Sequence, residues 1–348
     1  MTEIIRIGVD TSKSVFQLHG VDAQEQVVLR RKLRRRDMLV FFARQAPTRV
    51  GLEACGGSHY WARELSALGH RVELIPPQYV KPYVPRGKHD AADAEGICEA
   101  MSRPRVQRRL VPIKSAEAQA ALMLAGLRDR LVRQRTQLIN TIRGYAAEFG
   151  LVTAKGKAEI EPLLRRLQSE AAVPEGARAL FAELAEEHAR LDRQIEAAEA
   201  RLMAWHRQDE QSRRLAEIPS VGPIGASFLV LKAPDPQRFR SGRDFAAWLG
   251  LTPKNHSTAG KQRLGVITRA GDETLRSLLV VGATSVIQKV RRGTSRSAPP
   301  WLLALLARKP PKLAAVALAN KVARIAWKLM VSGERYDPGR SAAAPATN

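Results

Sequence analysis

The sequence is poor in the features of secreted and membrane-bound proteins. Its 348 residues include two cysteines, Cys55 and Cys98, too few for a disulfide framework or a cysteine-based zinc site. The N-terminal segment goes directly into a strand pattern and lacks the charged and then apolar layout of a signal peptide. No apolar run approaches the roughly 20 residues that span a bilayer. We therefore expect a cytoplasmic protein without a membrane partner.

Aromatic and acidic residues are also scarce. Aromatics make up 5% of the chain, which disfavours a single-strand binder built on stacking platforms. Asp and Glu number 34 against 57 Lys and Arg, so the formal charge is +23. A protein for neutral metabolites would not need this excess, and a polyanion is the natural partner. Hydrophobic residues are nevertheless 45%, enough for real cores in two or three domains.

The charge is uneven along the chain. Residues 1–113 hold 19 Lys and Arg against 12 Asp and Glu, and residues 114–213 hold 16 against 15. Residues 214–348 hold 22 against 7, which makes the C-terminal part the strongest electrostatic footprint. We expect four parts in this order: an α/β domain at 1–113, a helical arm at 114–213, a mainly helical domain at 214–336 and a disordered tail at 337–348.

The first part alternates the hydrophobic patterns of strands and helices. Three early strands precede alternating helices and strands, which is typical of an α/β sheet domain. We expect strands at 4–9, 15–21, 27–33, 49–53 and 71–75, and helices at 37–45, 58–68 and 90–101.

The middle part has a helical period. Apolar residues recur at spacings of three, four or seven through 124–149 and again through 180–205. Two long amphipathic helices about 30 residues apart predict an antiparallel helical hairpin or a coiled-coil arm. An ordinary helical core packed on the sheet is the alternative.

Four acids stand at the ends of predicted elements. Asp10 ends the first strand, Glu53 ends another just before two glycines, and Asp90 and Asp93 share one face at the start of a helix. Together they could converge on one or two Mg²⁺ ions, which prefer hard oxygen ligands and can clamp both oxygens of a phosphoryl transfer. Each acid alone could equally be a surface charge or a helix N-terminal residue.

Two other segments could contact a phosphate backbone. The run Arg30–Arg36 (RRKLRRR) fits a nucleic-acid patch, or a solvated strand edge protected by charge. The stretch IPSVGPIGA at 218–226 has the pattern of a helix-hairpin-helix turn, in which Gly222 and Gly225 would expose backbone N–H groups to phosphate. A plain interhelical loop is the alternative there.

A polar loop at Asn255–Gly265 contains Ser257. A serine hydroxyl is a poor nucleophile unless a base, a metal or nearby charge assists it, and most loop serines have no chemical role. Cations would stabilise the charge that develops on an attacked phosphate. Four stand close to Ser257 in the sequence: Lys254, Lys261, Arg263 and Arg269.

Four motifs together carry a family resemblance. They are GVDTSK at 8–13, LEACGGSHYWARELSALGH at 52–70, KHDAADAEGI at 88–97 and LGLTPKNHSTAGKQRLGVITRAGDETLR at 249–276. In order and spacing the chain resembles the insertion-sequence transposases that pair a RuvC-like (ribonuclease H-like) D-E-D-D domain with a C-terminal serine domain, relatives of the pilin-gene DNA invertase.

The resemblance implies a mechanism and partners. Asp10, Glu53, Asp90 and Asp93 match the four metal-binding acids, and Ser257 matches the nucleophile that forms a phosphoserine with DNA. The expected partners are double-stranded donor and target DNA, a structured bridge RNA that guides the enzyme, and further subunits, as homodimers that pair into tetramers. Ala259 replaces a glycine found in many relatives, and the adjacent Thr258 leaves the nucleophile open by one position.

Two alternatives remain at this point. A RuvC-like nuclease that cuts DNA junctions with metal-activated water would need the acids but not the serine. A non-catalytic nucleic-acid-binding protein would need only the C-terminal charge and the turn at 218–226.

Overall fold

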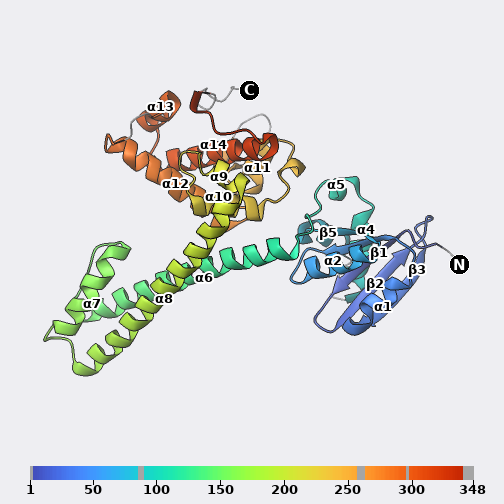
Figure 1. Cartoon of the computed structure of the whole chain (residues 1–348), viewed down its shortest axis with the longest axis horizontal. Coiled ribbons are helices and arrows are strands. Elements are labelled where there is room, and N and C mark those ends of the chain that lie inside the picture. The colour runs from blue at the N-terminus through green and yellow to red at the C-terminus, as the bar shows by residue number, and fades with distance from the viewer. Residues whose placement is uncertain (1–2, 85–89, 257–262, 295–297, 340–348) are drawn as a thin grey trace. The chain divides into compact units, whose positions relative to one another are not determined.

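The computed structural model describes residues 3–84, 90–256, 263–294 and 298–339 (Figure 1). It is a mixed α/β structure, mostly helical, with one central mixed sheet, as the sequence predicted. The chain divides into two compact units, residues 1–119 and 120–348. The arm and the C-terminal part belong to the same second unit, so their separation into two domains stays a prediction.

The first unit is built on a five-stranded sheet with the order β3-β2-β1-β4-β5. The first three strands pair antiparallel, whereas β1, β4 and β5 run parallel. All five lie within about two residues of the predicted ranges: β1 Arg6–Thr11, β2 Val15–Val21, β3 Val27–Arg34, β4 Arg49–Glu53 and β5 Arg71–Ile75.

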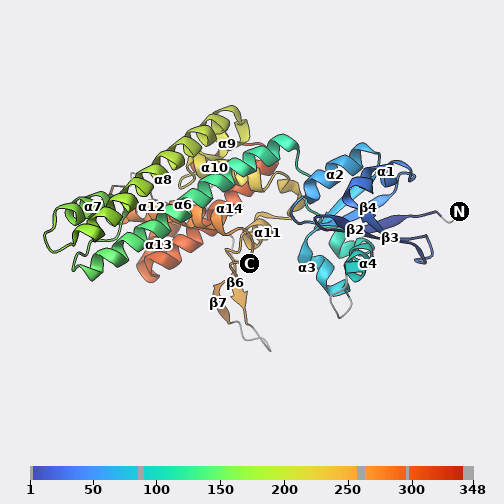
Figure 2. The same cartoon turned by 90° about the horizontal axis from the view of Figure 1, so that it is seen from below.

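Helices cover both faces of this sheet (Figure 2). One face packs against α1 (Met38–Ala43) and α2 (Ser58–Ala67), and the other against α4 (Asp90–Met101). Successive strand residues face opposite sides, so Ile7 and Val9 enter the core under α1 and α2 while Gly8 faces α4. Short helical segments not predicted from the sequence complete the unit: η1 Arg35–Asp37, α3 Pro77–Val80, η2 Lys81–Tyr83 and α5 Pro104–Gln107.

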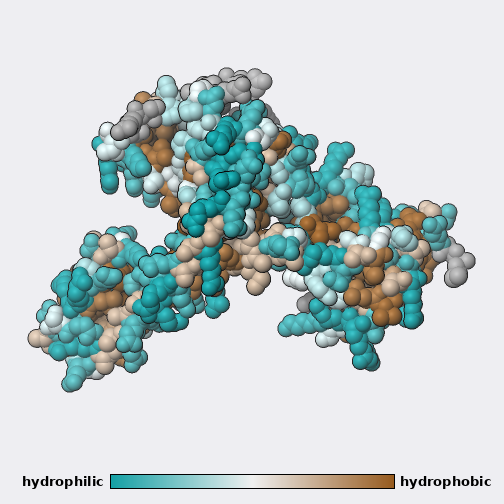
Figure 3. Space-filling model, in the orientation of Figure 1, coloured by the Kyte–Doolittle hydropathy of each residue, from teal (hydrophilic) through white to brown (hydrophobic). Residues whose placement is uncertain are grey.

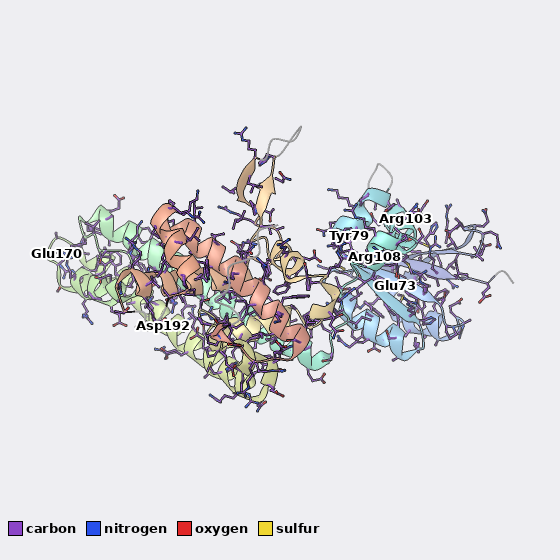
Figure 4. The ribbon with its side chains drawn as sticks, turned by 90° about the horizontal axis from the view of Figure 1, so that it is seen from above. Glu73, Tyr79, Arg103, Arg108, Glu170 and Asp192 are labelled. Carbon is purple, nitrogen blue, oxygen red and sulfur yellow. The ribbon has the colours of Figure 1, made fainter. Side chains whose placement is uncertain are left out.

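A buried ion pair joins β4 to β5 on the α4 side. The Glu73 side chain, labelled in Figure 4, is 1% exposed. Arg49 donates from Nε to its Oε1 at 3.0 Å and from Nη2 to its Oε2 at 3.2 Å. Gln107 donates a further hydrogen bond to Oε2 at 2.7 Å. The carboxylate is therefore desolvated but well partnered, which makes it sensitive to the loss of one partner.

The second unit begins with the predicted helical hairpin, formed by α6 (Ala116–Glu148) and α8 (Glu175–Gln208). Two interhelical ion pairs, Arg128–Glu199 and Arg135–Asp192, show that the helices run antiparallel, since one residue number rises as the other falls. A helix absent from the prediction, α7 (Ile160–Ser169), buries Leu163 and Leu167 in the same core. In Figure 3 polar side chains cover much of the visible face of α6 and α8.

The rest of the second unit is helical with one small hairpin. Its core includes Ala125 and Leu202 from the base of the arm, and α14 contributes the largest share of its buried residues. The elements are η3 Lys157–Glu159, α9 Glu210–Leu215, α10 Pro223–Lys232, η4 Pro236–Arg238, α11 Gly242–Trp248, β6 Pro253–Asn255, β7 Leu264–Ile267, α12 Glu273–Arg291, α13 Pro300–Arg308 and α14 Pro311–Ser332. Within the described ranges no helix is long and apolar enough to cross a membrane.

We expect the substitution Arg49→Met to destabilise the first unit by about 3 kcal/mol, because it leaves the Glu73 carboxylate buried without its main cation. Hydrogen exchange of the β4 and β5 amides measures this loss as faster opening. The double variant Arg49→Met/Glu73→Met should recover most of the stability, since both charges are removed together. As a matched control, Arg36→Met breaks the exposed Arg36–Asp37 pair and should cost less than about 0.5 kcal/mol. Equal losses of stability in Arg49→Met and Arg36→Met would show that burial of the Arg49–Glu73 pair has no effect.

Candidate metal and nucleic-acid sites

Two glycines let α4 approach the centre of the sheet. Gly8 of β1 and Gly51 of β4 are register partners on neighbouring parallel strands. A Cβ added at Gly8 would lie 2.3 Å from the Ala94 carbonyl oxygen and 2.5 Å from the Cys98 nitrogen. One added at Gly51 would lie 2.4 Å from Met101 Sδ. A side chain at Gly8 would push α4 away from the strands, whereas one at Gly51 would displace the Met101 side chain.

The same strands place two of the predicted acids beside this helix. Asp10 lies two residues after Gly8, and Glu53 lies two residues after Gly51. Side chains two apart in a strand point to the same face, so both acids leave the sheet on the α4 side at the carboxyl ends of β1 and β4. Both are partly buried. The sequence analysis predicted the strand ends but not the glycine pair that sets the helix above them.

The first turn of α4 brings the other two acids to this edge. Asp93 is partly buried, one residue before the Ala94 carbonyl that contacts Gly8. Burial, and then the nearby Asp93 charge, raise the pKa of Glu53 above its ordinary value. Asp90 is the first residue of α4, but its side chain lies outside what the structure describes. Glu53 and Asp93 therefore lie near each other, Asp10 shares their face of the sheet, and the contribution of Asp90 stays a prediction.

The donor set fits a hard divalent cation. Its members are carboxylates. A bound cation would offset the burial and the Asp93 charge that disfavour ionisation of Glu53. Among the side chains that the structure describes, no three His, Cys, Asp or Glu residues stand close enough to share a metal ion. Asp90 would have to supply a further ligand.

Other polar groups border this edge. Thr11, the last residue of β1, has its Oγ1 3.6 Å from the sulfur of the exposed Cys55, which lies two residues after β4. His59 Nδ1 accepts a hydrogen bond from the Lys114 backbone N–H at 3.3 Å, and His59 Nε2 lies 3.0 Å from Lys114 Nζ. Burial, with the Lys114 and Arg63 charges, lowers the pKa of His59 to about 4, so this histidine is neutral at physiological pH. None of Thr11, Cys55, His59 and Lys114 was predicted from the sequence as a site residue.

Strands flank the serine segment and include Asn255, Leu264 and Gly265, which the sequence predicted as parts of a loop from 255 to 265. Strands β6 and β7 pair antiparallel, and the His256 N–H donates to the Arg263 carbonyl at 2.8 Å. Ser257 and Lys261 fall in 257–262, outside the described residues. Lys254, in β6, is exposed.

Two further cations follow Lys254 along the hairpin. Arg263, directly before β7, is exposed. Arg269 follows β7 with a φ of 56°, and its N–H donates to the Gly250 carbonyl at 3.2 Å. Three of the four predicted cations therefore flank the serine segment on exposed backbone.

The glycine turn of 218–226 does join two helices. Gly222 is the N-cap of α10 and is exposed, and no side chain caps this helix. Ser220 before it has a φ of 79°, and its carbonyl would lie 2.0 Å from a Cβ at Gly282, so the turn packs closely on α12. Gly225 lies in the first turn of α10. The uncapped N–H groups are suited to a phosphate, as the sequence analysis proposed.

The basic run occupies the sheet edge. It lies on β3, the terminal strand, and continues into η1. The Arg31 guanidinium lies 5.1 Å from the Phe41 ring centre, and the Arg35 guanidinium lies 5.0 Å from that of Trp61. These arginines hence have a structural role on the aromatic core, and charges on a terminal strand also oppose edge-to-edge pairing.

Comparison with known proteins identifies the chain's relatives. The family described as Transposase IS116/IS110/IS902 matches residues 212–298, and the DEDD transposase domain of IS110 matches residues 7–149. The y4pF/y4sB transposase of Sinorhizobium fredii is 66% identical over 96% of this chain and 86% of its own length. A family 20 transposase of Pseudomonas aeruginosa is 48% identical, over 96% of this chain and 99% of its own.

A third relative is the transposase for insertion sequence element IS1328 of Yersinia enterocolitica, 38% identical over 96% of this chain and 98% of its own. These matches extend from the acidic edge of the sheet through the serine segment and cover nearly the whole chain. The chain therefore belongs to the IS116/IS110/IS902 family of insertion-sequence transposases, enzymes that cut and rejoin DNA.

Proposed function

We propose that this transposase cuts DNA with Ser257 and holds Mg²⁺ with Asp10, Glu53, Asp90 and Asp93. The observation that carries the proposal is the placement of Glu53 beside Asp93 where α4 crosses the ends of β1 and β4. A carboxylate whose ionisation a neighbouring carboxylate disfavours would be stabilised by a cation that binds both. The mixed sheet with helices on both faces supports a RuvC-like first domain.

The acids have the role of ligands. Mg²⁺ would supply Lewis-acid stabilisation of charge on the scissile phosphate. Asp10 and Glu53 stand on neighbouring strands, while Asp90 and Asp93 stand on the helix packed against them, and ligands carried by such packed elements would suit a preorganised metal site.

Ser257 is the proposed nucleophile. Its Oγ forms a bond to phosphorus while the bond from phosphorus to the DNA 3′ oxygen breaks, and the hydroxyl proton ends on that 3′ oxygen. Attack by a second strand's 3′-OH reverses the exchange and frees the serine, so no nucleotide cofactor is consumed. Lys254, Lys261, Arg263 and Arg269 would stabilise charge on the attacked phosphate.

The proposed partners follow the family resemblance. Donor and target are double-stranded DNA, and a bridge RNA selects them by base pairing. Gly222 and Gly225 would hold a backbone phosphate at the α10 N-terminus. A homodimer that pairs into a tetramer would allow the acids of one subunit and the serine of another to share a phosphate. The arm leaves Met123 70% and Leu127 44% exposed on successive turns of α6, which supports a subunit contact there.

The second candidate is a junction nuclease that uses the acids and water. It is favoured only by the acid edge, which it shares with the first proposal. The two differ in their products, because water leaves a free 5′-phosphate whereas serine leaves the protein joined to DNA.

We expect Ser257→Ala to abolish the covalent protein–DNA adduct and to lower strand transfer more than about 100-fold, because no oxygen remains to attack phosphorus. A radiolabelled DNA substrate followed on a denaturing gel measures both. Thr258→Ala is the matched control and should retain the adduct. An adduct that persists in Ser257→Ala would overturn the serine assignment, and retained cutting with free 5′-phosphates would favour the nuclease.

The acid edge gives a second expectation, for Glu53→Gln. The pKa of Glu53 is raised in the folded state, so stability from this group increases as pH falls through that pKa and is lost as pH rises above it. Without metal, Glu53→Gln should therefore melt at or above the wild-type temperature at pH 7.5. Saturating Mg²⁺ or Mn²⁺ should stabilise the wild type by about 2.7 kcal/mol at a hundred times Kd but not the variant.

Glu95→Gln is the control, because Glu95 is an exposed acid on the same helix. It should keep both the metal-induced shift in melting temperature and strand transfer, whereas Glu53→Gln should lose both. A full metal-induced shift in Glu53→Gln would remove Glu53 from the ligand set.

A further inference from the structure

The second unit contains a large groove. Its volume is about 1420 Å³, and residues of α11, α13, α14, both strands of the β6–β7 hairpin and 334–337 line it. Pockets for small molecules typically measure ~300–1000 Å³, so this groove admits a larger ligand. Its hairpin wall includes Pro253 and Ile267, the outer ends of the two strands between which Ser257 lies in the sequence.

The groove is strongly basic. Six Lys and Arg side chains line it against two acids, Glu334 and Asp337. Lys328 Nζ lies 3.6 Å from Glu334, so one of the two acids is in an ion pair with a lysine of the groove. Within the part of the chain that the structure describes, Arg243, Arg308 and Arg324 have no ion-pair partner. Cations that outnumber the acids around them to this extent attract an anionic ligand.

The groove also gathers aromatic rings. Two of the five tryptophans, Trp301 and Trp327, line it together with Tyr336. Trp327 Nε1 donates to the Pro236 carbonyl at 2.9 Å, but Trp301 Nε1 is buried without a hydrogen-bond partner among the described residues. A buried N–H left without an acceptor is unfavourable, and an acceptor on a ligand would remove that penalty.

A lysine is held against one of these rings. Lys321 Nζ lies 4.5 Å from the Trp301 ring centre. Burial, and then the Arg324 charge, lower the pKa of Lys321, and a bound anion would raise it again. The scarcity of aromatics in the whole chain had argued against base stacking, but the structure concentrates rings and cations at one place.

Apolar surface completes the groove. Val266 is 69% exposed on β7 and Leu313 is 58% exposed on α14, and both line it. Duplex DNA presents phosphates and stacked bases whose faces are hidden, so apolar and aromatic walls gain little from it. An unpaired strand presents both phosphates for the cations and base faces for the apolar walls.

We propose that this groove binds an unpaired DNA strand, of the kind that a transposase releases when it opens a duplex to cut it. Phosphates would contact Arg243, Arg308 and Arg324, and one base or phosphate oxygen would accept the Trp301 N–H. The proposal rests on the family's DNA-cutting activity and does not depend on Ser257 as the nucleophile.

The test measures binding of fluorescent 12-mer oligothymidine to the full-length protein by anisotropy over a salt series. Each of Arg243→Glu and Arg308→Glu should weaken binding about tenfold. Each should also lower the slope of log affinity against log salt by roughly 0.7, the value for one phosphate contact on a single strand. Trp301→Phe keeps the ring but removes the N–H, and should weaken binding several-fold without changing the slope.

Arg291→Glu is the matched control, because Arg291 is an exposed arginine at the end of α12 that does not line the groove. It should change affinity less than twofold. Photocrosslinking with 5-iododeoxyuridine should join the oligonucleotide to residues of α13 or α14. Equal losses in Arg308→Glu and Arg291→Glu, or crosslinks confined to other elements, would overturn the proposal.

Two competitors test the identity of the strand. Duplex DNA and 12-mer oligouridine should each displace the oligothymidine at least tenfold less well, and tighter binding of either through the same arginines would replace the proposed occupant. Because binding is measured without cleavage, these results stand whatever Ser257→Ala shows. Deletion of residues 340–348 should leave affinity unchanged; a tenfold gain would make the chain's own end the occupant.

Discussion

The close packing of α4 on the two central strands is the constraint on which the acidic edge depends. Gly8 and Gly51 are register partners, and the space above them is filled by the backbone of α4 and by Met101. With a side chain at Gly8, the helix backbone would have to move and carry Asp90 and Asp93 with it. The spacing of two residues from glycine to acid on each strand then fixes the face on which Asp10 and Glu53 lie.

The sequence predicted much of the first unit because local patterns and the fold agree there. Each of the five strands is a short run of β-forming residues bounded by turn residues, and the pattern located all five within about two residues. The four acids were predicted as element-end residues for the same reason. What the pattern could not give is the approach distance of α4, because a glycine in a strand reads equally as a bulge, a bend or a close contact.

The second unit shows where sequence patterns fail. The hairpin β6–β7 has exposed apolar residues on both sides of Gly265, among them Leu264 at 62% and Val266 at 69%, so no buried face imposes an alternating signal. Helix α7 occupies the connection between two stronger periodic stretches, and its ten residues are too few to stand out from a long loop. The groove was also invisible, because its walls come from segments between residues 241 and 337.

The distribution of acids, more than that of bases, decides where the positive charge of this transposase acts. In the arm, bases and acids are nearly equal in number, and pairs such as Arg128–Glu199 and Arg135–Asp192 use their charge internally. Beyond residue 213 there are 22 bases but 7 acids, so the bases outnumber the acids of that segment by 15. Such cations must stay hydrated or meet an external anion, and those that line a partly apolar groove lose hydration there. The balance of charges along the chain therefore favours nucleic-acid contact in the C-terminal helices over contact along the arm.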